Sequence, residues 1–262
     1  MIKREIRYFF TALMFYSRIP CPSWTDHSEE YLNKSRKYFP AIGIIVAAIS
    51  AGVYFLAQLI LPQNVGIILS MIASVLTTGA FHEDGFTDVC DAFGGGWGKD
   101  HILTIMKDSR IGAYGGIGIG LLMALKYGLL IEIVAKSDAY VLIISLLAAH
   151  TCSRFVASTF IQTHEYVQDI DKSKSKPITS NKLSIAEMAL SACFVIIPLF
   201  LFAHYAIILA VVLAYLSKVY LANYFKKYIG GYTGDCLGAT QQVAEVMFYI
   251  GVLIYLKILP LI

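Results

Sequence analysis

Seven apolar segments of membrane length dominate this chain and limit the folds that it can adopt. A helix of roughly 20 apolar residues crosses the hydrocarbon core of a bilayer and satisfies its own backbone hydrogen bonds there. The sequence therefore predicts an all-α fold, a polytopic bundle of about seven transmembrane helices. The predicted spans are residues 39–61, 64–82, 112–135, 138–162, 185–203, 205–225 and 242–261.

The composition agrees with a membrane protein built as one unit. Hydrophobic residues make up 57% of the 262 residues and charged residues only 15%, whereas a soluble domain holds about 45–50% apolar residues. We therefore expect residues 1–262 to form a single integral membrane domain. The net charge of +3, without a basic stripe, gives no indication of a nucleic-acid partner. The five cysteines show no paired spacing, so neither a disulfide framework nor zinc is expected.

Lysine and arginine are concentrated in polar segments that an alternating topology places on one side of the membrane. These are the N-terminal segment and the loops 83–111, 163–184 and 226–241. Because cytoplasmic loops carry the excess of Lys and Arg, we expect the N-terminus and these loops in the cytoplasm and the chain in the cell (inner or plasma) membrane. Basic and aromatic residues over 3–17 also predict a short interfacial helix in contact with membrane lipid.

A dense acidic cluster, His82–Asp91, follows the second apolar segment. Asp84, Asp88 and Asp91 are spaced at i, i+4 and i+7, which places them on one face of a helix. Three like charges on one face repel unless a cation lies between them, and carboxylate oxygens suit Mg²⁺ or Mn²⁺. The alternative is a solvated acidic loop, which the apolar residues between the acids disfavour. The cluster therefore predicts a divalent metal site.

Two further segments on the same membrane side could contact phosphate. Lys107 and Arg110 offer cationic donors, with Arg able to bind bidentately; their alternative role is to set the topology. The glycine-rich turn 230–238 exposes backbone N–H groups to an anion and carries Asp235; its alternative is a plain turn. Carboxylates, cations and a glycine-rich turn at one face together suit phosphoryl or phosphodiester transfer.

Several ionisable residues fall within the predicted spans, where charge is costly. Arg154 lies about two turns inside its span, so a carboxylate or phosphate partner is expected; snorkelling is the alternative. His150, one turn away, is expected to be packed and hydrogen-bonded. Lys126 and Lys218 are expected to snorkel or form ion pairs, and Glu245 is a further candidate of lower weight.

Three blocks of residues, in order along the chain, resemble a known family. They are His82–Asp91, Met106–Gly115 and Gly231–Ala239, with support from Phe10–Pro20 and Tyr38–Gly43. Together they resemble the adenosylcobinamide-GDP ribazoletransferases, also called cobalamin synthases. The similarity covers nearly the whole chain, and the first two blocks are its most specific part.

The resemblance implies an Mg²⁺-dependent membrane enzyme of late cobalamin (vitamin B12) biosynthesis. Such an enzyme joins adenosylcobinamide-GDP to α-ribazole, or to its 5′-phosphate, through the ribazole 3′-hydroxyl and releases GMP. The resemblance is also compatible with association of this protein with other enzymes of that pathway. The implied metal ligands are Asp84, Asp88, Asp91 and Glu83, with His82 as a further ligand or base. The implied substrate-binding residues are Lys107, Arg110, Arg154, Gly234 and Asp235. Which carboxylate accepts the proton stays open.

Two other classes of protein also use acidic residues in or at a membrane. A CDP-alcohol phosphotransferase also uses an acidic membrane helix, but its motif requires an Ala-Arg pair where this chain has Phe86-Thr87. A cation transporter would use the acids as a selectivity ring along a pore, whereas here they are predicted at one face.

Overall fold

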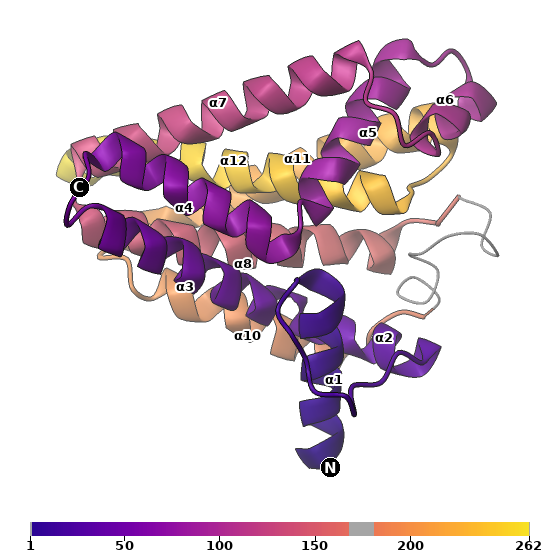
Figure 1. Ribbon diagram of the computed structural model, residues 1–262, viewed down its shortest axis with the longest axis horizontal. Coiled ribbons are helices and arrows are strands. Elements are labelled where there is room, and N and C mark those ends of the chain that lie inside the picture. The colour runs from indigo at the N-terminus through magenta and orange to yellow at the C-terminus, as the bar shows by residue number, and fades with distance from the viewer. Residues whose placement is uncertain (1, 168–180, 262) are drawn as a thin grey trace.

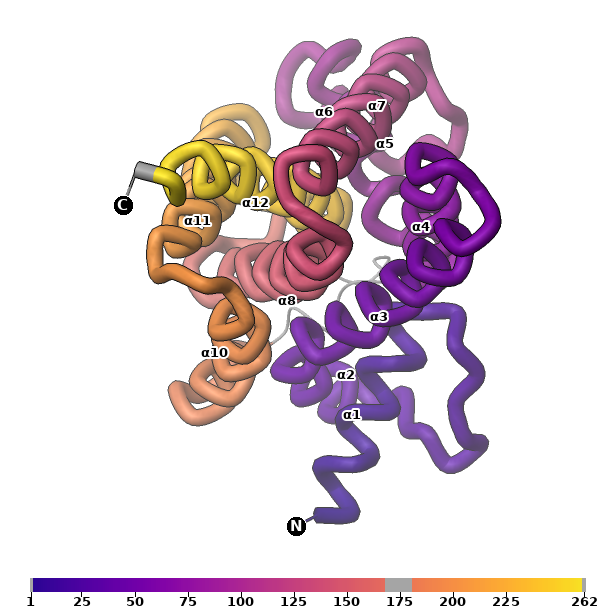
Figure 2. The backbone as a smooth tube through the Cα atoms, turned by 90° about the vertical axis from the view of Figure 1, so that its left-hand side faces the viewer, coloured from indigo at the N-terminus to yellow at the C-terminus, as the bar shows by residue number. Residues whose placement is uncertain are grey.

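The helix α8 (Ala139–Thr163) forms the centre of the computed structural model, which describes residues 2–167 and 181–261. Asp138 caps its first turn by accepting a hydrogen bond of 2.9 Å from the backbone N–H of Val141. Most residues of α8 are buried, because other helices pack around it, among them the following four (Figure 2). These are α3 (Phe39–Ala57), α10 (Ile185–Leu199), α11 (Ile208–Ile229) and α12 (Gly234–Ile258).

The remaining helices complete one side and one end of the bundle (Figure 1). They are α4 (Gln63–Thr78), α5 (Phe81–Gly95), α6 (Lys99–Met106) and α7 (Ala113–Lys136). α4 and α5 meet at an angle of 90°. Gly79 and Ala80 both have positive φ there, at 67° and 57°. Two successive left-handed residues turn the chain sharply, so the span predicted over 64–82 ends early, at Thr78.

The all-α bundle is confirmed, and the count of seven spans is approximate. Within the described part of the chain, five helices are long and apolar enough to cross a membrane, or six if the bent pair counts as one span. All seven predicted segments coincide with a helix, but α4 and α10 have only 16 and 15 residues. Both are therefore shorter than the roughly 20 residues that a perpendicular span needs.

The last predicted span, 242–261, has the wrong start. α12 begins at Gly234, where Thr233 caps it by accepting from the backbone N–H of Cys236 at 3.4 Å. Its first half carries the polar residues Gln241 and Gln242, and Gln241 lowers the mean hydropathy of the residues that precede the predicted start. Both are buried inside the bundle, so their polarity is satisfied by protein and not by water.

The N-terminal segment packs beside the polar end of the bundle. It contains α1 (Ile2–Tyr16), α2 (Glu29–Ser35) and the 3-10 turn η1 (Arg36–Tyr38). The helix predicted over 3–17 is confirmed as α1, which projects away from the bundle (Figure 2). Lys37 Nζ and the Tyr38 hydroxyl donate to the Glu5 carboxylate at 3.0 and 2.8 Å, which anchors α1 to the start of α3.

The longer connections lie at the end of the bundle that carries α5 and α6, and the short turns lie at the other end (Figure 1). Residues 168–180 of the predicted basic loop 163–184 are outside the described residues. The segment just before them is tied to the α11–α12 turn. Val167 N–H donates to the Tyr232 carbonyl at 3.0 Å, and Tyr232 N–H donates to the Glu165 carbonyl at 3.1 Å. This contact fixes the start of α12 beside the end of α8.

Candidate active site

A cavity of about 530 Å³ opens at the polar end of the bundle, between α1, α5, α8 and α12. Its wall combines aromatic side chains with charged and polar ones. Its lining includes Arg18, Arg36, Phe39, His82, Asp84 and Asp235. Sequence positions more than 200 residues apart thus meet around one space.

Glycines bring α5 and α12 into backbone contact beside this cavity. A Cβ atom on Gly85 would lie 3.0 Å from the carbonyl oxygen of Asp235 and 3.1 Å from its Cα. A Cβ atom on Gly238 would lie 3.1 Å from the carbonyl oxygen of His82. Small residues at such crossings allow helices to approach closely. The crossing therefore places Asp235 next to the acidic face of α5.

Three carboxylates from these two helices form the acidic part of the site. Asp84 is exposed at the cavity, Asp88 is partly buried, and Asp88 interacts electrostatically with Asp84, Asp91 and Asp235. Among the described residues, no three His, Cys, Asp or Glu side chains are already disposed around one metal position. The donor set itself, hard carboxylate oxygens that repel one another, fits Mg²⁺ or Mn²⁺.

Asp91, the third acid of the predicted face, is engaged in holding α7. The backbone N–H groups of Gly112 and Gly115 donate to its two carboxylate oxygens at 2.7 and 2.8 Å. A side chain at either glycine would collide with this carboxylate. Asp91 thus caps the N-terminus of α7, where a negative charge is stabilising, and fixes α7 against α5.

The structure does not bring the predicted phosphate-binding pair Lys107 and Arg110 to the cavity. Both are exposed in the loop between α6 and α7, and neither lines the cavity. Arg110 forms an ion pair with Asp108, with its Nη2 atom 2.6 Å from the carboxylate. Side-chain and backbone hydrogen bonds from Arg110 lower the pKa of Asp108 to about 2.

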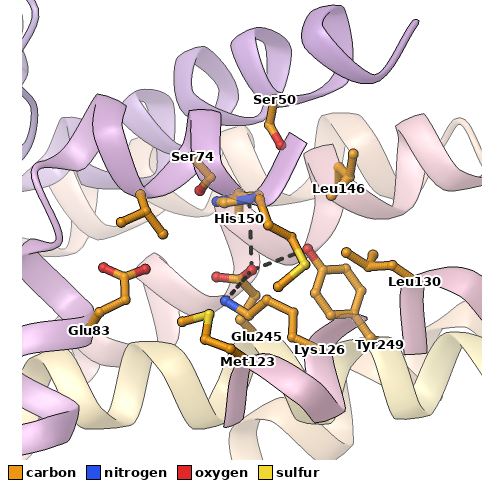
Figure 3. A pocket seen from close by; sticks show the side chains of 12 residues that line it. Ser50, Ser74, Glu83, Met123, Lys126, Leu130, Leu146, His150, Glu245 and Tyr249 are labelled. Carbon is orange, nitrogen blue, oxygen red and sulfur yellow. Dashed lines mark hydrogen bonds and ion pairs between the residues drawn. The ribbon is translucent and has the colours of Figure 1, made fainter. Parts of the chain in front are cut away.

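Glu83 belongs to a buried network in the middle of the bundle, not to the cavity (Figure 3). Arg154 joins the same network through His150. Gln242 Nε2 donates to Glu83 Oε1 at 2.9 Å, and Lys126 Nζ donates to Gln242 Oε1 at 2.8 Å. Lys126 also forms an ion pair of 3.1 Å with Glu245. The acidic helix α5 is therefore connected to α7 and α12 by polar contacts inside the bundle.

Glu245 is the centre of this network. It accepts hydrogen bonds from the Tyr249 hydroxyl at 3.2 Å and from Gln241 Nε2 at 2.9 Å, and His150 Nε2 lies 3.7 Å away (Figure 3). Arg154 Nη1 contacts His150 Nδ1 at 2.9 Å. A cavity of about 10 Å³ among these residues has room for one water molecule. Lys126 is thus ion-paired and His150 hydrogen-bonded, as the sequence indicated.

His82 is the buried member of the acidic cluster. Its ring stacks on Phe39, with 5.7 Å between centroids and 17° between planes. It is 2% exposed, and its Nε2 atom has no hydrogen-bond partner among the described residues. The residue also lines the cavity, so an unsatisfied buried nitrogen belongs to its wall.

Three residues of the site and its support carry no local sequence signal for these roles. The sequence predicts only a role in topology for Arg18 and Arg36, and it places Gln242 in an apolar span. Arg18 does fall within one of the blocks that carry the family resemblance. No local signal distinguishes a lysine or arginine that snorkels from one that lines an internal wall, since the distinction depends on distant helices.

Comparison with known proteins identifies the family. The sequence profile of the family described as cobalamin-5-phosphate synthase matches residues 8–253. A protein of Shewanella frigidimarina named adenosylcobinamide-GDP ribazoletransferase is 45% identical over 250 residues, 95% of either chain. A protein of the same name from Shewanella oneidensis is 41% identical over 251 residues, 96% of this chain and 95% of its own. No solved structure matches. The chain belongs to the cobalamin-5-phosphate synthase family.

Proposed function

We propose that this protein is an adenosylcobinamide-GDP ribazoletransferase, which joins adenosylcobinamide-GDP to α-ribazole or its 5′-phosphate. Similarity to proteins of that name over 95% of the chain supports the assignment. In the structure, one observation carries the assignment: Asp84 and Asp235 line the same cavity of about 530 Å³. Two carboxylates at the rim of a large cavity suit a phosphate-transfer reaction.

The proposed reaction exchanges one bond to phosphorus for another. The hydroxyl oxygen of the ribazole bonds to the phosphorus attached to the cobinamide arm. The bond from that phosphorus to the bridging oxygen of the diphosphate breaks, and GMP leaves with the electron pair. Nε2 of His82 is the candidate to accept the hydroxyl proton, because the residue lines the cavity and this atom has no hydrogen-bond partner among the described residues.

We further propose that Asp84, Asp88 and Asp235 hold Mg²⁺, with Mn²⁺ able to replace it. When bound, the ion would neutralise phosphate oxygens and the charge that develops on the leaving group. The carboxylates' own part is to fix that ion at the cavity wall. Glu83 and Asp91, the other ligands expected from the sequence, face the buried network and cap α7 instead.

The assay that tests this proposal measures GMP release by the purified protein in liposomes. We expect release only when both substrates and Mg²⁺ or Mn²⁺ are present, and we expect excess EDTA to abolish it reversibly. Full turnover in EDTA would refute the metal assignment. Turnover of a CDP-alcohol in place of the cobinamide substrate would refute the proposed activity. Metal-dependent ion flux through the liposomes without GMP release would instead favour a transporter.

A further inference from the structure

We propose that Arg18, Arg36 and the N-termini of α5 and α12 form the subsite that binds the diphosphate of the activated substrate. The identity of this anion rests on the proposed function; the subsite itself rests on the geometry of the cavity. Arg18 and Arg36 share its wall with Asp84 and Asp235. A bound diphosphate would therefore lie between cationic donors and the carboxylates that hold the metal.

Two helix N-termini point into the same space. The first residues of α5 and of α12, including Phe81 and Gly234, line the cavity. No side chain caps the start of α5, which follows the left-handed residues Gly79 and Ala80. Backbone N–H groups in a first helical turn have no acceptor within the helix. Together with the helix dipole they attract phosphate oxygens.

Arg18 is held in place at this turn. Its backbone N–H donates to the carbonyl of Thr77 at 2.8 Å, which docks the segment after α1 on the end of α4. Its side chain passes over Gly79, where any Cβ atom would collide with the guanidinium. The absence of a side chain at Gly79 thus creates the place that the guanidinium occupies, beside the N-terminus of α5.

Arg36 occupies the wall formed by the N-terminal segment. It is 0% exposed, and its Nη2 atom donates to the carbonyl of Asn181 at 2.6 Å. The planar guanidinium carries five donors in a fork that matches phosphate geometry. Charge-assisted hydrogen bonds are strong where water is excluded. Its position at the cavity wall therefore suits direct contact with a diphosphate oxygen.

His82 supplies an independent indication that a polar ligand enters here. The residue lines the cavity and its ring is almost fully buried, yet its Nε2 atom finds no partner in the described part of the chain. Buried polar atoms nearly always have a hydrogen-bond partner in a native structure. In the proposed reaction the hydroxyl group of the bound ribazole would be this partner, next to the diphosphate.

The test measures binding of inorganic pyrophosphate and of GMP to the full-length protein in detergent with Mg²⁺, by calorimetry. We expect Arg18→Gln and Arg36→Gln each to weaken pyrophosphate binding about tenfold or more, since each removes a charge-assisted hydrogen bond. Arg18→Lys and Arg36→Lys should retain part of the affinity. The matched control is Arg7→Gln, an exposed arginine of α1 outside the cavity, which should bind as the unaltered protein does.

Steady-state kinetics separate a binding role from a general structural one. In both Gln variants, we expect the KM for adenosylcobinamide-GDP to rise by the factor by which pyrophosphate binding weakens. The KM for α-ribazole should stay unchanged. Unaltered pyrophosphate affinity in both variants overturns the subsite, and so does an equal rise of both KM values together with a lower melting temperature. If the unaltered protein binds pyrophosphate through these arginines but releases no GMP, the proposed activity fails and the subsite stands.

Discussion

Glu245 is a carboxylate buried inside the bundle, away from bulk water. It is 2% exposed and is compensated by Lys126, by hydrogen bonds from Tyr249 and Gln241, and by the nearby His150. Breaking one side of such a pair leaves an uncompensated buried charge, whereas removing both sides does not. The network therefore makes its members depend on one another for stability.

A double-mutant cycle of Lys126 and Glu245 tests whether the two side chains stabilise each other. Lys126→Met should lower the free energy of unfolding by about 3–5 kcal/mol. The double variant Lys126→Met with Glu245→Gln should lose clearly less than the sum of the two single variants. Thermal unfolding in detergent measures these values. Strict additivity would show that the two side chains do not form the ion pair of 3.1 Å.

The acidic residues of α5 should separate into two classes on substitution. Asp84→Asn and Asp88→Asn should lower GMP release by about a hundredfold or more, as expected when charge stabilisation at a phosphate is lost, with little change in melting temperature. Asp91→Asn keeps one acceptor oxygen for two backbone donors, so it should lower stability by about 0.5–2 kcal/mol. Equal effects of all three on GMP release, with equal stability, would contradict this division.

At the scale of elements, the crossing of α5 and α12 decides where the carboxylates meet. Gly85→Ala would place a methyl group 3.0 Å from the Asp235 carbonyl oxygen, so α5 must move away. We expect a loss of about 1–3 kcal/mol from overpacking and a larger loss of GMP release. Gly116→Ala on α7 is the matched control, since an added Cβ there meets no atom within 4 Å. Normal turnover by Gly85→Ala would show that the separation of Asp84 and Asp235 is not critical.

Local sequence patterns predict the helices well, but they do not predict which residues of distant helices contact one another. The i, i+4, i+7 spacing correctly placed Asp84, Asp88 and Asp91 on a helix, because helical periodicity is a property of adjacent residues. It could not show that Gly112 and Gly115 would occupy both oxygens of Asp91. These contacts join positions more than 20 residues apart, and only the folded arrangement defines them.

The same limit explains the other differences. Hydropathy located α12 too late because Asp235, Thr240 and Gln241, which precede residue 242, are polar by composition, although Gln241 is satisfied inside the bundle. Glu83 lies one residue from Asp84, yet a step of one residue on a helix rotates a side chain by about 100°. Its carboxylate consequently faces the interior, whereas that of Asp84 faces the cavity.

At the scale of the whole molecule, we propose that the end carrying α5 and α6 faces the cytoplasm, from the lysine and arginine bias of the loops. In a Cys193→Ser background, which removes the exposed cysteine, Ser109→Cys should react with a membrane-impermeant maleimide only in inside-out vesicles. Gln63→Cys, at the α3–α4 turn of the opposite end (Figure 1), should react only in intact cells. Reversed labelling would invert the proposed orientation.

The small cavity around Glu245 has a consequence for the energetics of the host membrane. Protons cross bilayers along continuous files of water or of titratable groups, and leakage dissipates the gradient that drives the cell. Here several ionisable side chains are gathered in the interior. The cavity among them has a volume of about 10 Å³, which has room for a single water molecule. One water cannot form a file across roughly 30 Å of hydrocarbon. Within the described part of the chain, this cavity therefore offers protons no continuous file of water across the membrane.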